Sequence, residues 1–166
     1  MPFEAYIAVG TSILFNGEAG ANVAFSVEGV ANGAGRVSAQ RDLGASPRPA
    51  MYAWSCKVQW QATPVQGGVL ELYVAGAPDA DATMIDGDVG NADAALADVD
   101  MRRNLHYIGA VTSENAAASE VCVASGSFEH FDRYISIVAF NGANATINAT
   151  DANFVFRLAP VYWQGQ

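Results

Sequence analysis

Apolar and polar residues alternate most strictly between residues 51 and 61. A period of two places successive side chains on opposite faces of an extended chain, so this stretch predicts a strand with one aromatic, buried face and one polar face. The apolar positions are Tyr52, Trp54, Cys56, Val58 and Trp60. Two tryptophans on one face indicate a strand near the centre of a sheet, where their side chains anchor the core.

Shorter stretches of the same kind recur along the chain, each bounded by Gly, Asn, Pro or Asp. We predict further strands at residues 6–9, 12–15, 23–28, 35–41, 69–75, 105–111, 120–125, 134–140, 145–148 and 153–158. The alternation directs Leu70, Leu72 and Val74 inward, with Glu71 and Tyr73 outward. It also directs Phe154, Phe156 and Leu158 inward, with Arg157 on the other face. The dipeptides Asn16-Gly17 and Asn141-Gly142 are typical of tight hairpin turns.

Many short strands with almost no helical periodicity predict an all-β fold. We expect a jelly-roll or related antiparallel β-sandwich, with an immunoglobulin-like sandwich and a small closed barrel as alternatives. A length of 166 residues suits a single domain, and the chain has no internal repeat and no change of composition typical of a linker. We expect that domain to cover residues 1–166, with an N-terminal arm and the first strands in 1–15.

Residues 76–104 form the exception, a long loop with seven aspartates and two arginines. Loops of this length usually have a function or carry structure of their own, and 92–99 is predicted to make a helical turn. Carboxylates and an amide at Asp86, Asp88, Asn91 and Asp93 are a candidate calcium set. This set departs from the EF-hand pattern because glycine stands at the fifth position and no glutamate at the twelfth. We favour a solvated loop whose aspartates cap local backbone N–H groups, and predict no metal.

Charge limits the possible partners. Seventeen acidic and eight basic residues give a net charge of −9, and the arginines are scattered, so phosphate backbones are repelled and no nucleic-acid partner is expected. Charged residues make up 15% of the chain, below the roughly 25% typical of globular domains, which is consistent with a surface partly covered by partners.

The chain has no run of eighteen apolar residues, so no membrane span is predicted. Glu4 stands where a signal peptide would be basic, which predicts a protein made and kept in the cytoplasm before any assembly.

Candidate chemical groups do not converge on a reaction. Cys56 and Cys122 are expected to be buried thiols. His130, beside Glu129 and Asp132, is interpreted as a surface histidine at a strand end. The chain contains no GxSxG, HExxH, GxGxxG or GxxxxGK[ST] motif. We therefore predict no enzyme and no cofactor. A glycosidase pair of carboxylates stays open, because nothing singles out two of the seventeen acidic residues.

Aromatic side chains are the remaining candidates for a binding site. Sugars stack on exposed aromatic rings in β-sandwich lectins, and Tyr73, Tyr107, Tyr162 and Trp163 are candidates for this role. For Tyr162 and Trp163 we favour docking of the C-terminal segment onto its own domain or a neighbouring chain.

Several segments together resemble the head decoration, or cement, proteins of tailed bacteriophages. The segments are YAWSCKVQWQ (52–61), VLELYV (69–74), DGD (86–88), RNLHYIG (103–109), ASGSF (124–128), RYIS (133–136) and LAPVY (158–162). The resemblance implies a jelly-roll or related sandwich on the outer surface of the head, commonly as a trimer, that holds neighbouring capsomers together. It implies a virion location, with the major capsid protein and further copies of the chain as partners.

Under this resemblance, contacts are expected from the N-terminal arm (Pro2 to Ser12), from the connection Pro47-Arg48-Pro49 and from the Asp-rich loop. The interface candidates are Pro2, Phe3, Tyr6, Pro47, Arg48, Pro49, Tyr162 and Trp163. The alternatives are a carbohydrate- or receptor-binding module of a phage tail, which would stack sugars on exposed aromatic rings, and another tail or neck subunit.

Overall fold

Two β-sheets packed face to face form the protein. The computed structural model describes residues 5–17 and 21–165. Strands take 46% of the chain and helices 9%, and the described helices are short 3-10 turns, so the predicted all-β sandwich is confirmed. Among the described residues no helix has the length and apolar character needed to cross a membrane.

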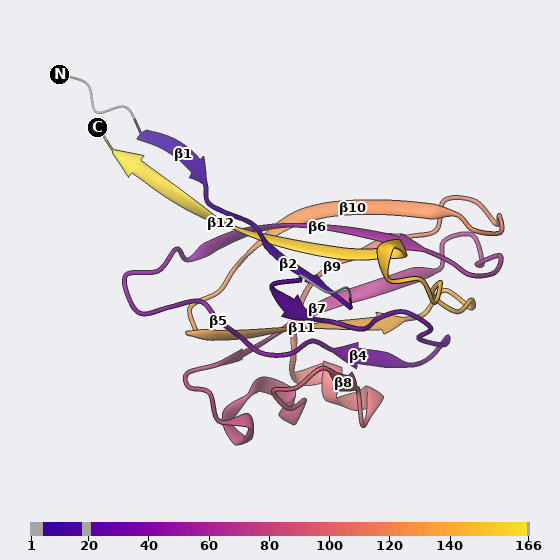
Figure 1. Ribbon diagram of the computed structural model, residues 1–166, viewed down its shortest axis with the longest axis horizontal. Coiled ribbons are helices and arrows are strands. Elements are labelled where there is room, and N and C mark those ends of the chain that lie inside the picture. The colour runs from indigo at the N-terminus through magenta and orange to yellow at the C-terminus, as the bar shows by residue number, and fades with distance from the viewer. Residues whose placement is uncertain (1–4, 18–20, 166) are drawn as a thin grey trace.

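Sheet A contains the strands nearest both ends of the chain (Figure 1). Its order is β10 (Val121–Glu129), β6 (Met51–Gln59), β12 (Phe154–Gly165), β2 (Ile13–Asn16) and β3 (Val23–Ala24), and β1 (Ala5–Val9) also pairs with β12. Sheet B has the order β8 (Ala94–Ala95), β4 (Gly35–Val37), β11 (Tyr134–Asn141), β7 (Val69–Ala77) and β9 (His106–Thr112), with β5 (Arg41–Asp42) also on β11. Neighbouring strands are mostly distant in sequence, as in jelly rolls, and every pair is antiparallel except β2 with β3.

The core between the sheets follows the predicted alternation. The inward residues of β7 and β12 are buried, as are Trp54 and Trp60, while Arg157 is exposed on the opposite face of β12. Both cysteines are free and buried on the inner face of sheet A, as predicted, and burial raises the pKa of the Cys56 thiol. Because each fully buried large apolar side chain contributes about 1.5–3 kcal/mol, this inner layer is the main source of stability.

A second, smaller core lies on the outer face of sheet B. The Asp-rich segment folds there as η1 (Ala82–Met84), η2 (Asp86–Asp88), β8 and η3 (Val99–Asn104). Its apolar residues Ile85, Val89 and Leu96 pack against sheet B, so the segment covers the sheet instead of forming a solvated loop. The helical turn expected at 92–99 is wrong, because that stretch holds β8. The expected capping is confirmed, since Asp81 and Asp98 accept hydrogen bonds from backbone N–H groups at the starts of η1 and η3.

Several predicted elements are shorter or absent. The predicted strand 23–28 is reduced to β3, 35–41 divides into β4 and β5, and 145–148 makes one isolated bridge between Ile147 and Trp60. Neither Asn-Gly dipeptide joins two strands of a hairpin. After Asn16-Gly17 the next strand, β3, runs parallel to β2, and β2 pairs with β12 instead. After Asn141-Gly142 the next strand is β12, which belongs to the other sheet. These predictions failed because local turn preference does not choose a strand's partner.

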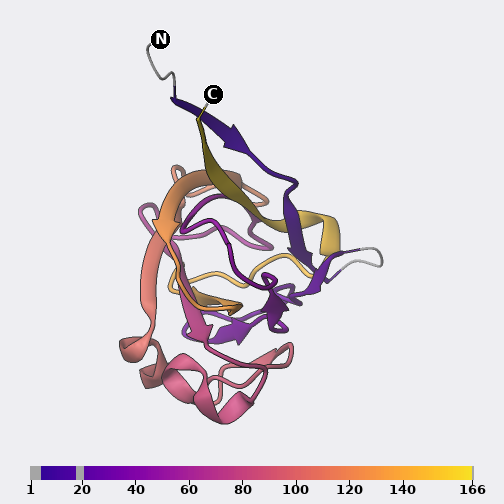
Figure 2. The same cartoon turned by 90° about the vertical axis from the view of Figure 1, so that its left-hand side faces the viewer.

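Strand β12 continues beyond the sandwich as one arm of a two-stranded ribbon. Its last residues pair with β1 from Val9 opposite Val161 to Ala5 opposite Gly165. Figures 1 and 2 show this ribbon projecting from one end of the molecule, while the Asp-rich segment lies at the opposite end.

Candidate binding site at the base of the ribbon

Two prolines determine where pairing between β6 and β12 stops. The ladder ends with Met51 opposite Val161, and the same register would place Pro49 opposite Trp163 and Pro47 opposite Gly165. Proline has no backbone N–H and cannot continue the ladder. The chain therefore leaves the sheet before Met51, and β12 beyond Val161 has a partner strand on the β1 side only.

The direction of the backbone groups along β12 follows from one hydrogen bond. The carbonyl oxygen of Pro160 accepts from the N–H of Gly10 at 2.8 Å, so Pro160 faces the β1 side. Backbone groups of successive strand residues point to alternate sides. Tyr162 therefore faces β1, and Trp163 directs its N–H and C=O toward the open side, which we call the open edge of β12.

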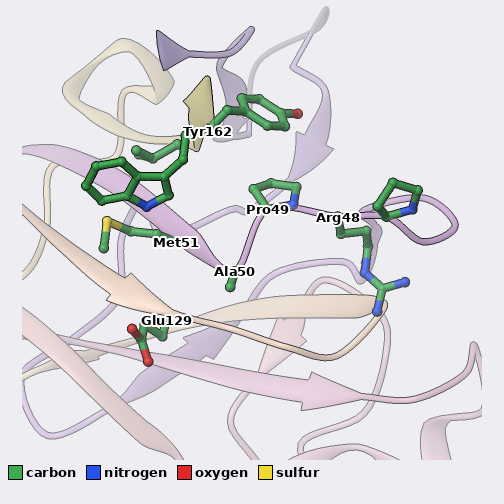
Figure 3. Close-up of a pocket in the computed structure, with 9 residues that line it drawn as sticks. Arg48, Pro49, Ala50, Met51, Glu129 and Tyr162 are labelled. Atoms are coloured by element: carbon green, nitrogen blue, oxygen red, sulfur yellow. The ribbon is translucent and has the colours of Figure 1, made fainter. Parts of the chain in front are cut away.

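A pocket of about 400 Å³ lies against this open edge (Figure 3). Its lining residues are Pro47, Arg48, Pro49, Ala50, Met51, Glu129, Val161, Tyr162 and Trp163. The structure thus brings together the predicted interface residues of the proline connection and of the C-terminal segment. Sequence analysis missed Ala50, Met51, Glu129 and Val161. The alternation through β6 did place Met51 on the outer face, but it could not show that β10 and β12 flank it.

The outer face of the ribbon is apolar and exposed. Ile7 lies opposite Trp163 and Val9 lies opposite Val161, and residues directly opposite in a ladder share one face. Ile7, Val9 and Trp163 are 62%, 63% and 68% exposed. We call Ile7, Val9 and Trp163 the ribbon face. Adjacent exposed apolar residues of this kind form a candidate surface for binding a partner.

Two opposite charges flank the pocket. The guanidinium of Arg48 donates to the carbonyl oxygens of Gly44 at 3.1 Å and Phe131 at 3.0 Å, which holds the proline connection in place. Glu129 is exposed on β10, and Figure 3 shows it and Arg48 on opposite sides of Ala50. Neither side chain belongs to an ion pair among residues 5–17 and 21–165.

His130 lies behind the proline connection and not on the surface, so the interpretation of a surface histidine is wrong. It is buried and lines a hollow of about 130 Å³ together with Ser46, Arg48, Pro49, Ala50 and Phe131. Its Nε2 lies 3.2 Å from the carbonyl oxygen of Tyr134. Burial lowers the pKa of His130, while that carbonyl and the carboxylates of Asp132 and Asp86 oppose the shift. The imidazole is therefore a packed neutral group at neutral pH.

The other predicted aromatic and arm residues lie elsewhere. Tyr73 and Tyr107 form an edge-to-face pair on sheet B, with ring centroids 5.4 Å apart, so they do not join Tyr162 and Trp163. Tyr6 is opposite Gln164 in the ribbon, and its side chain lies outside the described residues, as do Pro2 and Phe3 entirely.

The calcium candidates are not brought together. Asp93 is held by Arg36, with Nε to Oδ1 at 2.7 Å, and by the Ser26 hydroxyl at 2.6 Å. Asp86 accepts from the N–H of Gly76 at 3.0 Å. Within the described ranges, no group of three or more His, Cys, Asp or Glu side chains could hold a metal ion. Asp86 and Asp93 instead attach the Asp-rich segment to sheet B and to the loop that holds Ser26.

Comparisons with known proteins give only remote structural likeness. No family model and no curated protein sequence matches the chain. A crystal structure of mouse APRIL at pH 5.0 has 11% identity and a TM-score of 0.41, covering 75% of this chain and 72% of that one. The EclA C-terminal domain, a sugar-binding protein, has 13% identity and a TM-score of 0.35, covering 95% of this chain and 79% of that one. TM-scores this low do not establish a shared topology.

Proposed function

We propose that this chain is a virion structural protein without catalytic activity. In this proposal it is a tailed-phage head decoration protein that binds the outer surface of the head and stabilises contacts between capsomers. The observation that supports binding is the projecting ribbon, which exposes an apolar face and an open strand edge beside the pocket. The phage context rests on the resemblance carried by the segments between residues 52 and 162.

The two ends of the molecule suit opposite environments. The ribbon face is uncharged, whereas Asp79, Asp81, Asp88 and Asp98 at the far end are exposed and outside the described ion pairs. We propose that the ribbon faces the head and the acidic end faces solvent. Burying the ribbon face contributes at most about 1.5–3 kcal/mol per side chain, and association costs reduce that gain. Many copies, arranged as trimers, make such contacts durable through avidity.

The test compares heads assembled with and without this chain. Heads that carry it should survive heating and osmotic shock better than heads that lack it. Ile7→Thr should weaken head binding, because threonine keeps the β-branched shape suited to a strand but removes apolar area. The matched control is Val65→Thr, since Val65 is also half exposed but lies outside the ribbon. Equal survival of both kinds of head would refute the decoration role.

A carbohydrate-binding module of a phage tail is the second candidate. The exposed indole of Trp163 beside Tyr162 and the Glu129 carboxylate offers a stacking ring with a polar neighbour. This candidate predicts binding to specific glycans on an array and loss of that binding in Trp163→Ala. A map of the particle by cryo-electron microscopy separates a head location from a tail or neck subunit.

A further inference from the structure

We infer that the pocket receives an extended segment of a partner protein, which adds as a strand to the open edge of β12. The inference rests on the proposed binding role and specifies how the partner is held. The segment we expect has apolar side chains at alternate positions, an acidic group toward Arg48 and a basic group toward Glu129.

The edge supplies the backbone contacts. Strand addition needs exposed N–H and C=O groups that no strand of the protein itself takes up. Trp163 directs both groups to the open side, and the prolines at the two in-register positions cannot donate to them. The edge from Tyr162 to Gly165 spans about 13 Å at the usual rise of a strand. Such a short ladder provides few hydrogen bonds, so the lining side chains must supply much of the affinity.

The lining is suited to that role. Met51, Val161 and the Trp163 indole give an apolar side, while Pro47 and Pro49 form a rigid opposite wall. A volume of about 400 Å³ falls within the usual range of binding pockets.

Charge determines which kind of segment fits. Arg48 and Glu129 stand on opposite sides of the pocket, and neither has an ion-pair partner in the described structure. A segment crossing the pocket with an acid and a base in the matching order would compensate both charges. A second copy of this chain is the alternative occupant, and the dimerisation measurement below separates it from a different protein.

The experiment uses a yeast-displayed library of random nonapeptides selected against the intact protein. Enriched peptides should alternate apolar and polar residues and carry one acid and one base. A synthetic copy of the most enriched peptide is then titrated against the wild type, Trp163→Ala and Trp163→Pro. Both variants lack the indole, but only the proline variant lacks the N–H that faces the open edge. We expect Trp163→Pro to bind at least tenfold more weakly than Trp163→Ala.

Two further measurements keep the inference testable if Trp163→Pro does not fold. Amide hydrogen exchange at Trp163 in the wild type should slow when the peptide binds. The variant Glu129→Lys, at an exposed residue that does not hold the proline connection, should lose the original peptide and bind one in which an acid replaces the base. Absence of alternating peptides, unchanged exchange at Trp163, or equal binding by the alanine and proline variants would overturn strand addition. A concentration-dependent dimer that Trp163→Pro abolishes would make a second copy the occupant and overturn the inference.

Failure of this inference can be distinguished from failure of the decoration role. If Trp163→Pro decorates heads as well as Trp163→Ala does, strand addition is wrong and decoration stands. If the protein captures alternating peptides but does not bind heads, strand addition stands and decoration is wrong.

Discussion

Gly126 on β10 is expected to be a critical steric position, because it lies against the buried indole of Trp54 although the glycine itself is exposed. A Cβ atom there would lie 2.8 Å from Nε1 and 2.9 Å from Cε2 and Cζ2 of Trp54, whereas ordinary contacts begin at 3.4 Å. The indole cannot retreat easily, because it stacks on Phe156 at 6.1 Å and also lies against Gly109. Gly126 does not have a positive φ, so the penalty is steric. We expect Gly126→Ala to lower the free energy of unfolding by about 1–3 kcal/mol, the usual cost of overpacking.

Urea unfolding at equilibrium measures this cost. Ser127→Ala is the matched control, because Ser127 is the next residue of β10 and is exposed, and we expect it to change stability by less than about 0.5 kcal/mol. In a Trp54→Phe background, which removes the indole, Gly126→Ala should cost about 1 kcal/mol less. Equal costs for Gly126→Ala in the two backgrounds, or a cost no larger than that of the control, would refute the steric explanation.

Three further predictions concern buried charge and metal. Burial lowers the pKa of His130 in the folded state, so only the unfolded chain takes up the proton as pH falls below 6.5, and stability should drop from there toward the lowered value. His130→Gln should flatten the dependence of the urea midpoint on pH between 7 and 5, and an unchanged slope would contradict this. Asp93→Ala should cost about 1–3 kcal/mol in urea unfolding, because it leaves Arg36 and Ser26 without their partner. Asp100→Ala, which removes only a surface ion pair with Arg103, should cost little. Excess calcium chloride should leave Tm unchanged, and a clear rise in Tm would contradict the conclusion that the Asp-rich segment has no calcium site.

The core of the sandwich was predictable because, in a strand with one buried face, the alternation of apolar and polar residues determines which side chains point inward. Residues 51–61 and 69–75 show it clearly, and their inward side chains are buried. Pairing partners were not predictable in this way. The Asn-Gly dipeptides favour tight turns, yet β2 gains more by pairing with β12, next to β6, than it could in an isolated hairpin.

The sequence of β11 indicates that the Asp-rich segment or another part of the chain covers the outer face of sheet B, although our prediction from alternation did not consider this. In β11 nearly every residue from Tyr134 to Asn141 is buried, because one face meets the main core and the other meets the Asp-rich segment. The run ISIVAF (135–140) is apolar except for Ser136, and such a run indicates a strand covered on both faces. It therefore predicts that something covers the sheet. The run does not identify the cover, since Ile85, Val89 and Leu96 follow no regular period among the aspartates.

The binding site depends on register, which no local pattern contains. Sequence analysis selected the proline connection and the Tyr162-Trp163 pair separately, but their proximity follows only once Met51 is placed opposite Val161. A shift of one residue would set Arg48, which has an N–H, opposite Trp163 and would exchange the faces of the whole strand. The buried aromatic face of β6 forbids that shift. The same side chains that hold the core together therefore place the two prolines where they leave the edge of β12 open. The open edge is lined by Met51, Val161 and Trp163 beside Arg48 and Glu129, which is the arrangement that the proposed strand addition requires.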